Sequence, residues 1–256
     1  MKDYTEKTDR FIAQTILLVA PFVGRASMLL FVIFLFHGSF RFFLFGWSEI
    51  HVLAWDGALS LVFFVQHSGM IRSSFRHFLA TIIPAHYTYA VFNLISSIVL
   101  LAVFVFWQPS GTVIYELHGF SRWLARGIFV LTMGGIIWCV SALKFFDPFG
   151  SIPIRAYLSG RQLRPPKFVI NGPYLWVRHP LYFFVLGLIW SCPVLTSDRL
   201  LFNVLWTIWI YVGTVLEEKD LVSDFGLVYR QYQQKVPILI PWKGPIDRHE
   251  FNHNPE

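Results

Sequence analysis

Charged residues are scarce in this chain: Asp, Glu, Lys and Arg together make up only 14% of its 256 residues. A soluble domain contains about 25% of such residues, whereas 55% of this chain is hydrophobic. Apolar runs close to the ~20 residues that cross a bilayer recur along its length. These features exclude an ordinary soluble domain. They predict one all-α integral membrane domain over residues 1–256, a polytopic bundle of five to six transmembrane helices.

Several familiar site motifs are also missing from the sequence. The two cysteines, Cys139 and Cys192, both lie inside apolar runs, so no disulfide framework is expected. No histidines show a metal-ligand spacing such as HExxH, and there is no glycine-rich phosphate loop or GxSxG motif. We therefore predict no metal site.

Six apolar stretches predict membrane crossings, at roughly 26–46, 51–70, 87–107, 122–143, 180–195 and 199–217. Residues 11–23 are apolar but short, and either lie along the membrane surface or lead into the first span. Basic residues gather in the 71–86 loop, the 144–178 stretch and both ends of the chain. The positive-inside rule then predicts an integral membrane protein with both termini in the cytoplasm. The net charge of +6 fits this orientation pattern better than nucleic-acid binding.

The segment 171–184, NGPYLWVRHPLYFF, joins a polar turn to a long apolar run. Pro180 suits the first turn of a helix, where its missing N–H costs nothing. Arg178 and His179 therefore lie just outside a membrane helix. Glu217 and Glu218 lie where the last span returns to the same boundary, so the two segments predict one polar pocket on the cytoplasmic side. The alternatives are an arginine anchored at lipid headgroups and a solvated helix end.

The helix that carries Glu218 is expected to continue beyond the membrane, to break at Gly226 and to stop at Pro237. An apolar stripe at helical spacing runs along this extension. It lies either on the membrane or over the pocket. The stripe consists of Leu221, Phe225, Val228 or Tyr229, Tyr232 and Val236.

In the second span, Asp56, Ser60 and His67 share one helix face. Ionisable residues at membrane depth usually face a cavity or a partner. At this point His67 is either a satisfied histidine between helices or a catalytic group.

The motifs GPY, RHPxY, EE and FGxxYxxY within 171–241 resemble the isoprenylcysteine carboxyl methyltransferase-like superfamily. FFVQHSGMIRSSF (63–75), FWQP (106–109), FDPFG (146–150) and VPILIP (236–241) are similar to the methanethiol S-methyltransferase and NnrU-type branch, which extends the resemblance over nearly the whole chain. Ile71 and Ser73 depart from that branch, where a small residue and a proline are expected.

The resemblance implies S-adenosyl-L-methionine as a methyl donor, bound near the cytoplasmic face. It divides the chain into a four-helix part (26–143), a donor-binding methyltransferase-like part (144–241) and a polar tail (242–256). An arginine can pair with the donor's carboxylate, and a glutamate can accept from its ribose diol. Its adenine can stack on Trp176 or Tyr174. The positions that match the donor-binding motifs are Tyr174, Arg178, His179, Pro180, Tyr182, Glu217 and Glu218.

The implied reaction is methylation of a small apolar thiol, methanethiol to dimethyl sulfide, in a site that positions the reactants and excludes water. A thiol with a pKa near ~8.5 is mostly protonated at pH 7 and needs a base. His67 is the candidate base, Arg72 an electrostatic aid and Asp147 a second candidate. Expected partners are the thiol and the lipid bilayer, with no nucleic acid and no metal. Two alternatives remain: carboxyl methylation of a prenylcysteine, and a non-catalytic NnrU-type membrane protein.

Overall fold

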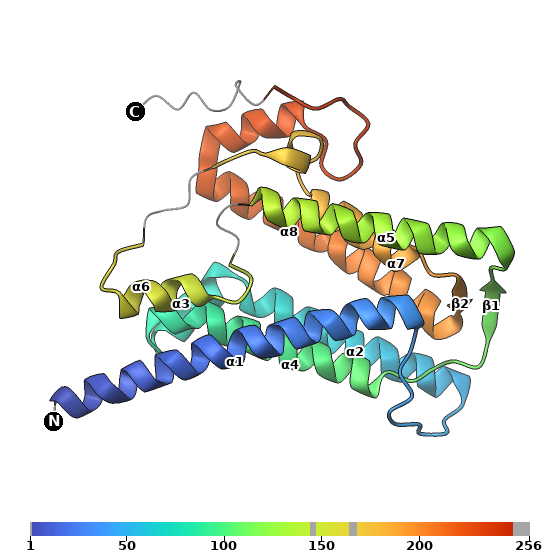
Figure 1. Cartoon of the computed structure of the whole chain (residues 1–256), viewed down its shortest axis with the longest axis horizontal. Coiled ribbons are helices and arrows are strands. Elements are labelled where there is room, and N and C mark those ends of the chain that lie inside the picture. The colour runs from blue at the N-terminus through green and yellow to red at the C-terminus, as the bar shows by residue number, and fades with distance from the viewer. Residues whose placement is uncertain (1, 144–146, 164–167, 248–256) are drawn as a thin grey trace. The chain divides into compact units, whose positions relative to one another are not determined.

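The computed structural model of the chain describes residues 2–143, 147–163 and 168–247, and of residues 2–7 the backbone alone (Figure 1). Parts of the predicted 144–178 stretch, including Phe146 of FDPFG, and most of the 242–256 tail lie outside these residues. The described residues are mostly helical, and the prediction of an all-α polytopic membrane protein is confirmed. The helices long and apolar enough to cross a membrane are Thr8–His37, Glu49–Met70, Ala85–Phe106, Gly119–Ala142 and Ser197–Lys235.

The chain forms two compact units, and neither is continuous in sequence. One unit contains Met1–Gly111 and Asp147–Pro165, and the other contains Thr112–Phe146 and Pro166–Glu256.

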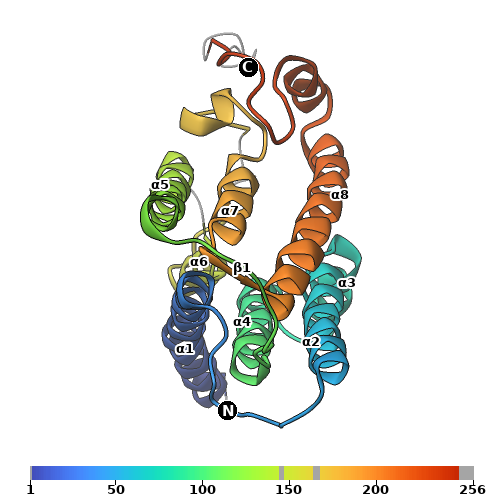
Figure 2. The same ribbon diagram turned by 90° about the vertical axis from the view of Figure 1, so that its right-hand side faces the viewer.

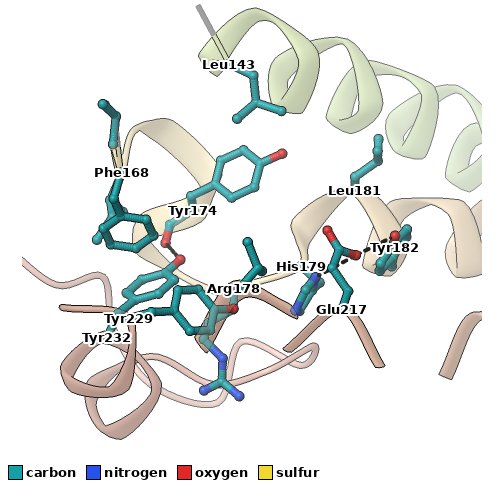
Figure 3. A pocket seen from close by; sticks show the side chains of 13 residues that line it. Leu143, Phe168, Tyr174, Arg178, His179, Leu181, Tyr182, Glu217, Tyr229 and Tyr232 are labelled. Atoms are coloured by element: carbon teal, nitrogen blue, oxygen red, sulfur yellow. Dashed lines mark hydrogen bonds and ion pairs between the residues drawn. The ribbon is translucent and has the colours of Figure 1, made fainter. Parts of the chain in front are cut away.

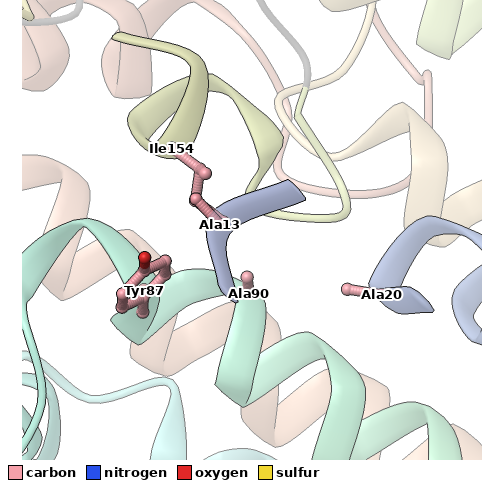
Figure 4. Packing of buried hydrophobic residues seen from close by; sticks show 5 residues of the cluster. All are labelled: Ala13, Ala20, Tyr87, Ala90 and Ile154. Atoms are coloured by element: carbon pink, nitrogen blue, oxygen red, sulfur yellow. The ribbon is translucent and has the colours of Figure 1, made fainter. Parts of the chain in front are cut away.

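The first unit is built around α4, which packs between α1 and α2 (Figure 2). Alanines allow α1 to approach α4 closely: Ala13, Ala20 and Ala90 are almost fully buried in a cluster with Tyr87 and Ile154 (Figure 4). The elements of this unit are α1 (Lys2–His37), α2 (Glu49–Met70), α3 (Ser73–Ala80), the 3-10 turn η1 (Ala85–Tyr87), α4 (Thr88–Phe106) and α6 (Ser151–Leu158).

The predicted first span, 26–46, is wrong in both of its boundaries. Helix α1 passes through Pro21 and ends at His37, and residues 38–47 are irregular. A proline inside a helix removes one backbone hydrogen bond, and a long apolar helix tolerates that loss. Residues 11–23 therefore form the first part of the candidate span rather than a separate surface segment.

Gln108 ties the irregular segment 38–47 to the end of α4. Its side chain donates to the carbonyl of Phe43 at 3.0 Å and accepts from the backbone N–H of Phe45 at 3.1 Å. The Gln108 backbone N–H donates to the buried carboxylate of Asp56 at 2.9 Å. The FWQP motif and Asp56 thus hold this end of the first unit together.

The second unit pairs α5 with α7 over small residues (Figure 2). A Cβ atom on Gly135 would lie 2.3 Å from the ring of Phe184, so only glycine allows this approach. The elements of this unit are β1 (Val113–Glu116), α5 (Gly119–Ala142), the 3-10 turn η2 (Gly172–Leu175), α7 (Pro180–Trp190), β2 (Val194–Thr196) and α8 (Ser197–Lys235).

The predicted fifth span, 180–195, is too long. Helix α7 has 11 residues and ends at Trp190, so it measures about 16 Å at ~1.5 Å per residue. After it, residues 194–196 form β2, which pairs antiparallel with β1. This strand pair was not predicted. The predicted fifth span included Val194 and Leu195, because apolar residues suit a membrane helix as well as a strand, and residues 113–116 lie between two predicted spans.

Helix α8 continues past the predicted sixth span, 199–217, as expected. Gly226 has backbone angles φ 58° and ψ −128°, which interrupt the helix, and the second part ends at Lys235, two residues before Pro237. The predicted break and stop are both confirmed.

Candidate active site

The segment 171–184 forms the floor of the site. Residues Gly172–Leu175 make a 3-10 turn, and Pro180 is the first residue of α7, as predicted. Arg178 and His179 therefore lie in the connection between the turn and the helix. Their backbone N–H groups donate to the carbonyls of Pro237 at 2.9 Å and Ile238 at 3.0 Å, which attaches this connection to the chain after α8.

Glu218 is the centre of a hydrogen-bond network. Its Oε1 accepts from Arg178 Nε at 3.0 Å, His179 Nε2 at 2.7 Å and the Tyr229 hydroxyl at 2.6 Å. Its Oε2 lies 2.9 Å from Arg178 Nη2 and accepts from Gln233 Nε2 at 2.6 Å. A carboxylate has only acceptors, so Nε2 of His179 carries a proton. The predicted convergence of the arginine, the histidine and the glutamates is present.

Arg178 has a second set of partners at the end of α8. Its Nη1 donates to the carbonyls of Gln233 at 2.9 Å and Val236 at 2.5 Å. The last carbonyls of a helix have no partner within the helix and carry partial negative charge. Arg178 therefore caps the C-terminal end of α8 and also pairs with Glu218.

Glu217 has a different environment from its neighbour. Its side chain is 43% exposed, against 9% for Glu218. Its Oε2 accepts from the Tyr182 hydroxyl at 2.6 Å and lies 3.7 Å from His179 Nδ1. The rings of His179 and Tyr182 stack 5.5 Å apart. Tyr182 and His179 therefore orient the Glu217 carboxylate without enclosing it.

A cavity of about 300 Å³ lies over this floor, at the lower end of the range for small-molecule sites (Figure 3). Tyr229 and Tyr232, from the stripe on α8, form part of its wall, so this part of the stripe lies over the pocket. The guanidinium of Arg178 points away from Tyr174 and Glu217 (Figure 3). The lining residues are Leu143, Phe168, Val169, Ile170, Tyr174, Arg178, His179, Leu181, Tyr182, Glu217, Leu221, Tyr229 and Tyr232.

Tyr174 presents a neutral hydroxyl to this cavity. Burial raises the pKa of Tyr174 above its usual value, and nearby Cys139 and Glu217 add to the effect. Its backbone carbonyl accepts from the Tyr232 hydroxyl at 2.5 Å, which holds η2 against the second part of α8. The Tyr174 hydroxyl therefore remains a hydrogen-bond donor throughout the physiological range.

The opposite face of the segment 171–184 lines a second cavity. Its volume is about 190 Å³, and every lining residue is apolar or aromatic. Tyr174, Arg178 and Tyr182 line the first cavity, and Trp176, Pro180 and Phe184 line the second. One segment thus separates a polar cavity from an apolar one.

Methanethiol S-methyltransferase of Pseudomonas sp. (strain GM41(2012)) is 37% identical over 190 residues, which cover 73% of this chain and 72% of that protein. The chain belongs to the methanethiol S-methyltransferase family. Methanethiol S-methyltransferase 1 of Bradyrhizobium diazoefficiens is 35% identical, and the match covers 73% of this chain and 66% of that relative's own length.

Nurim of Rattus norvegicus is a more distant relative, 26% identical over 75% of each chain. No family model matches the chain, and no solved structure matches it significantly. Membership of the methanethiol S-methyltransferase family confirms the resemblance inferred from the motifs, and the candidate spans agree with an integral membrane protein.

The residues predicted for the thiol side of the methanethiol S-methyltransferase reaction all lie in the first unit. The His67 ring lies between Phe63 and Phe92, with ring centroids 5.3 and 5.2 Å away. Arg72 immediately precedes α3. Asp147 Oδ2 accepts from the backbone N–H of Ile152 at 2.6 Å, so this carboxylate satisfies the first turn of α6. Their catalytic roles stay predictions.

The donor-binding residues predicted from the sequence did not include two members of the Glu218 network. Tyr229 was assigned only to the apolar stripe, and Gln233 was not considered. The first tyrosine of the FGxxYxxY motif was the available signal for Tyr229, because a tyrosine at a buried position usually needs a partner for its hydroxyl. Among the described residues, no group of three or more His, Cys, Asp or Glu side chains could hold a metal ion.

Proposed function

We propose that this chain methylates methanethiol to dimethyl sulfide with S-adenosyl-L-methionine as the donor. The observation that carries this proposal is the cavity over Glu217 in a chain of the methanethiol S-methyltransferase family. The names of these relatives state the thiol and the transferred group. These names do not state the methyl donor, so the identity of the donor rests on the fit of the cavity.

The chemistry of the cavity fits the proposed donor. S-adenosyl-L-methionine supplies, when bound, an electrophilic methyl group on a positively charged sulfur. Glu217 provides a carboxylate, and the faces of Phe168, Tyr174 and Tyr229 favour a cation. The neutral hydroxyl of Tyr174 can donate to an oxygen of the ligand. The residues proposed to hold the donor, directly or through one another, are Tyr174, Arg178, His179, Pro180, Tyr182, Glu217 and Glu218.

On the thiol side, His67 is the proposed base, Arg72 an electrostatic aid and Asp147 a second candidate base. An imidazole that accepts the thiol proton leaves a thiolate, which is the nucleophilic form of sulfur. The apolar residues around His67 would exclude water from that thiolate, which makes it more reactive. Asp147 is the weaker candidate, because one of its carboxylate oxygens already accepts from the α6 backbone.

In the proposed orientation the short apolar helix α7 makes a sixth crossing, and both termini and the cavity lie on the cytoplasmic side of a bacterial membrane. The basic loops support this orientation. A donor of this polarity is then available from the cytoplasm, while a small apolar thiol partitions into the bilayer. The proposed partners are accordingly the thiol and lipid, without a metal.

The deciding experiment uses purified protein in detergent with methyl-labelled donor and a panel of acceptors. We expect labelled dimethyl sulfide in the headspace when methanethiol is added. A base-labile methyl ester formed with a prenylcysteine acceptor, in place of dimethyl sulfide, would contradict the proposed acceptor. Absence of donor binding would contradict enzymatic activity and favour a non-catalytic membrane protein.

The base is tested separately with His67→Ala. We expect a single-turnover rate of methyl transfer reduced by about 100-fold or more, with donor affinity unchanged. His51→Ala is the matched control, because His51 is an exposed histidine on the same helix, hydrogen-bonded to Ser48. Equal rates in the two variants would exclude His67 as the base.

A further inference from the structure

The hydrogen-bonding capacity of Glu218 is already filled within the protein. Its two oxygens receive five donors, from Arg178, His179, Tyr229 and Gln233. A carboxylate offers about four lone-pair positions. The residue is also only 7% exposed. Glu218 therefore has no position left for a bound molecule.

The positive charge of Arg178 is likewise matched inside the protein. Four of its five N–H groups have partners, two on Glu218 and two on carbonyls at the end of α8. Its side chain is 10% exposed, and the guanidinium points away from the Tyr174 hydroxyl (Figure 3). Arg178 is thus poorly placed to pair with the carboxylate of a ligand.

Glu217 remains as the charged group that faces the cavity. Its Oε1 has no partner among the described residues, and its Oε2 has the Tyr182 hydroxyl. Among the described residues that line this cavity, Arg178 is the one lysine or arginine, and Glu218 already balances its charge. The cavity therefore carries a negative charge that a positively charged ligand would balance.

We propose that Glu217 selects the ligand by charge, pairing with the sulfonium–ammonium end of the donor rather than with its ribose diol. This inference rests on the proposed function and assigns the two neighbouring glutamates to different tasks. A carboxylate in a partly apolar cavity interacts much more strongly with a cation than it would in water. A diol needs only a hydrogen-bond acceptor, which a neutral amide oxygen also provides.

The test compares two ligands in Glu217→Gln by calorimetry. S-adenosyl-L-methionine carries the positive charges, whereas 5′-methylthioadenosine keeps the adenine and ribose but is neutral. We expect the substitution to weaken binding of the charged ligand by about 10- to 100-fold and of the neutral ligand by less than about threefold. Equal weakening of both ligands would overturn the proposal and assign Glu217 to the shared nucleoside. No change for either ligand would overturn it as well.

Glu218→Gln is the matched control, since it removes the same charge one residue away. We expect it to lower the melting temperature by several degrees, whereas Glu217→Gln shifts it by less than about 2 °C. An equal thermal loss in both variants would show that Glu217 is structural and would overturn the proposal. If Glu217→Gln weakens binding of the charged ligand selectively but wild-type protein forms no dimethyl sulfide, the proposed function fails and the assignment of Glu217 stands. If wild-type protein binds no donor, both fail.

Discussion

Arg178 and Glu218 form a two-point ion pair between the start of α7 and the middle of α8. Nε donates to Oε1 at 3.0 Å, and Nη2 lies 2.9 Å from Oε2. Both side chains are about one-tenth exposed, at 10% and 9%. The planar guanidinium matches the carboxylate in a way that no other side chain reproduces. The pair therefore joins the two segments of the site through geometry as well as charge.

Arg178→Lys is predicted to destabilise the protein by about 1–3 kcal/mol and to weaken donor binding. Lysine keeps the charge but loses both the paired contacts with Glu218 and the bonds to the end of α8. Unfolding in detergent, followed by circular dichroism, measures the first effect. Arg122→Lys is the control: its contact with Glu116 is 3.7 Å long, both side chains are more than 40% exposed, and its loss should cost less than about 1 kcal/mol. Similar losses in the two variants would contradict a special role for Arg178.

Gly226→Ala is predicted to cost about 1–3 kcal/mol, because its φ of 58° with ψ of −128° is accessible to glycine and strained for alanine. An added Cβ would meet no atom within 4 Å, so the loss would report backbone strain alone. Gly213→Ala is the control, because Gly213 lies on the same helix with equally open surroundings and a helical backbone. This substitution should stabilise the protein by up to about 1 kcal/mol. A neutral Gly226→Ala would show that the break in α8 is not required.

Gly135→Ala is predicted to destabilise the second unit by about 1–3 kcal/mol, because the new methyl group would lie 2.3 Å from the ring of Phe184. Gly134→Ala is the neighbouring control, with no atom within 4 Å of its added Cβ. Thermal unfolding of the two variants in the same detergent separates close packing from helix propensity. Equal stability would mean that α5 and α7 do not require the close approach.

Tyr174→Phe is predicted to change how stability depends on pH in the alkaline range. The raised pKa of Tyr174 means that the folded state holds this proton more tightly than the unfolded chain, whose tyrosine titrates near ~10. Its contribution is complete below pH ~10 and is lost as the pH rises further. Wild-type protein should therefore lose up to about 1.4 kcal/mol per pH unit relative to Tyr174→Phe above that pH. Parallel curves above pH 10 would contradict the raised pKa.

Parts of the fold were predictable because they depend on local features of the chain. Pro180 begins α7, and Gly226 breaks α8, since each residue restricts or frees its own backbone wherever the rest of the chain lies. The end of the first span was not predictable in this way. Hydrophobicity continues through residues 38–47, and the contacts of Gln108 with that segment come from residues about sixty positions away.

The candidate site was likewise predictable in part from the sequence. The motif pair RHPxY and EE predicted that Arg178, His179 and the glutamates converge, and these residues do lie together. The sequence presents Glu217 and Glu218 as equivalent neighbours. Their roles differ because successive residues on a helix are rotated by about 100°. The Glu218 side chain therefore points toward five internal hydrogen-bond donors, while the Glu217 side chain lines the cavity.

The sequence by itself determined the membrane class, the family and the two segments that build the site, because hydrophobic run length and short motifs are properties of adjacent residues. Only the tertiary structure decided that Arg178 is neutralised inside the protein, that Tyr229 and Gln233 complete the Glu218 network, and that one Glu217 oxygen has no partner among the described residues. The physical reason is that a side chain's availability depends on which donors the rest of the chain brings to it.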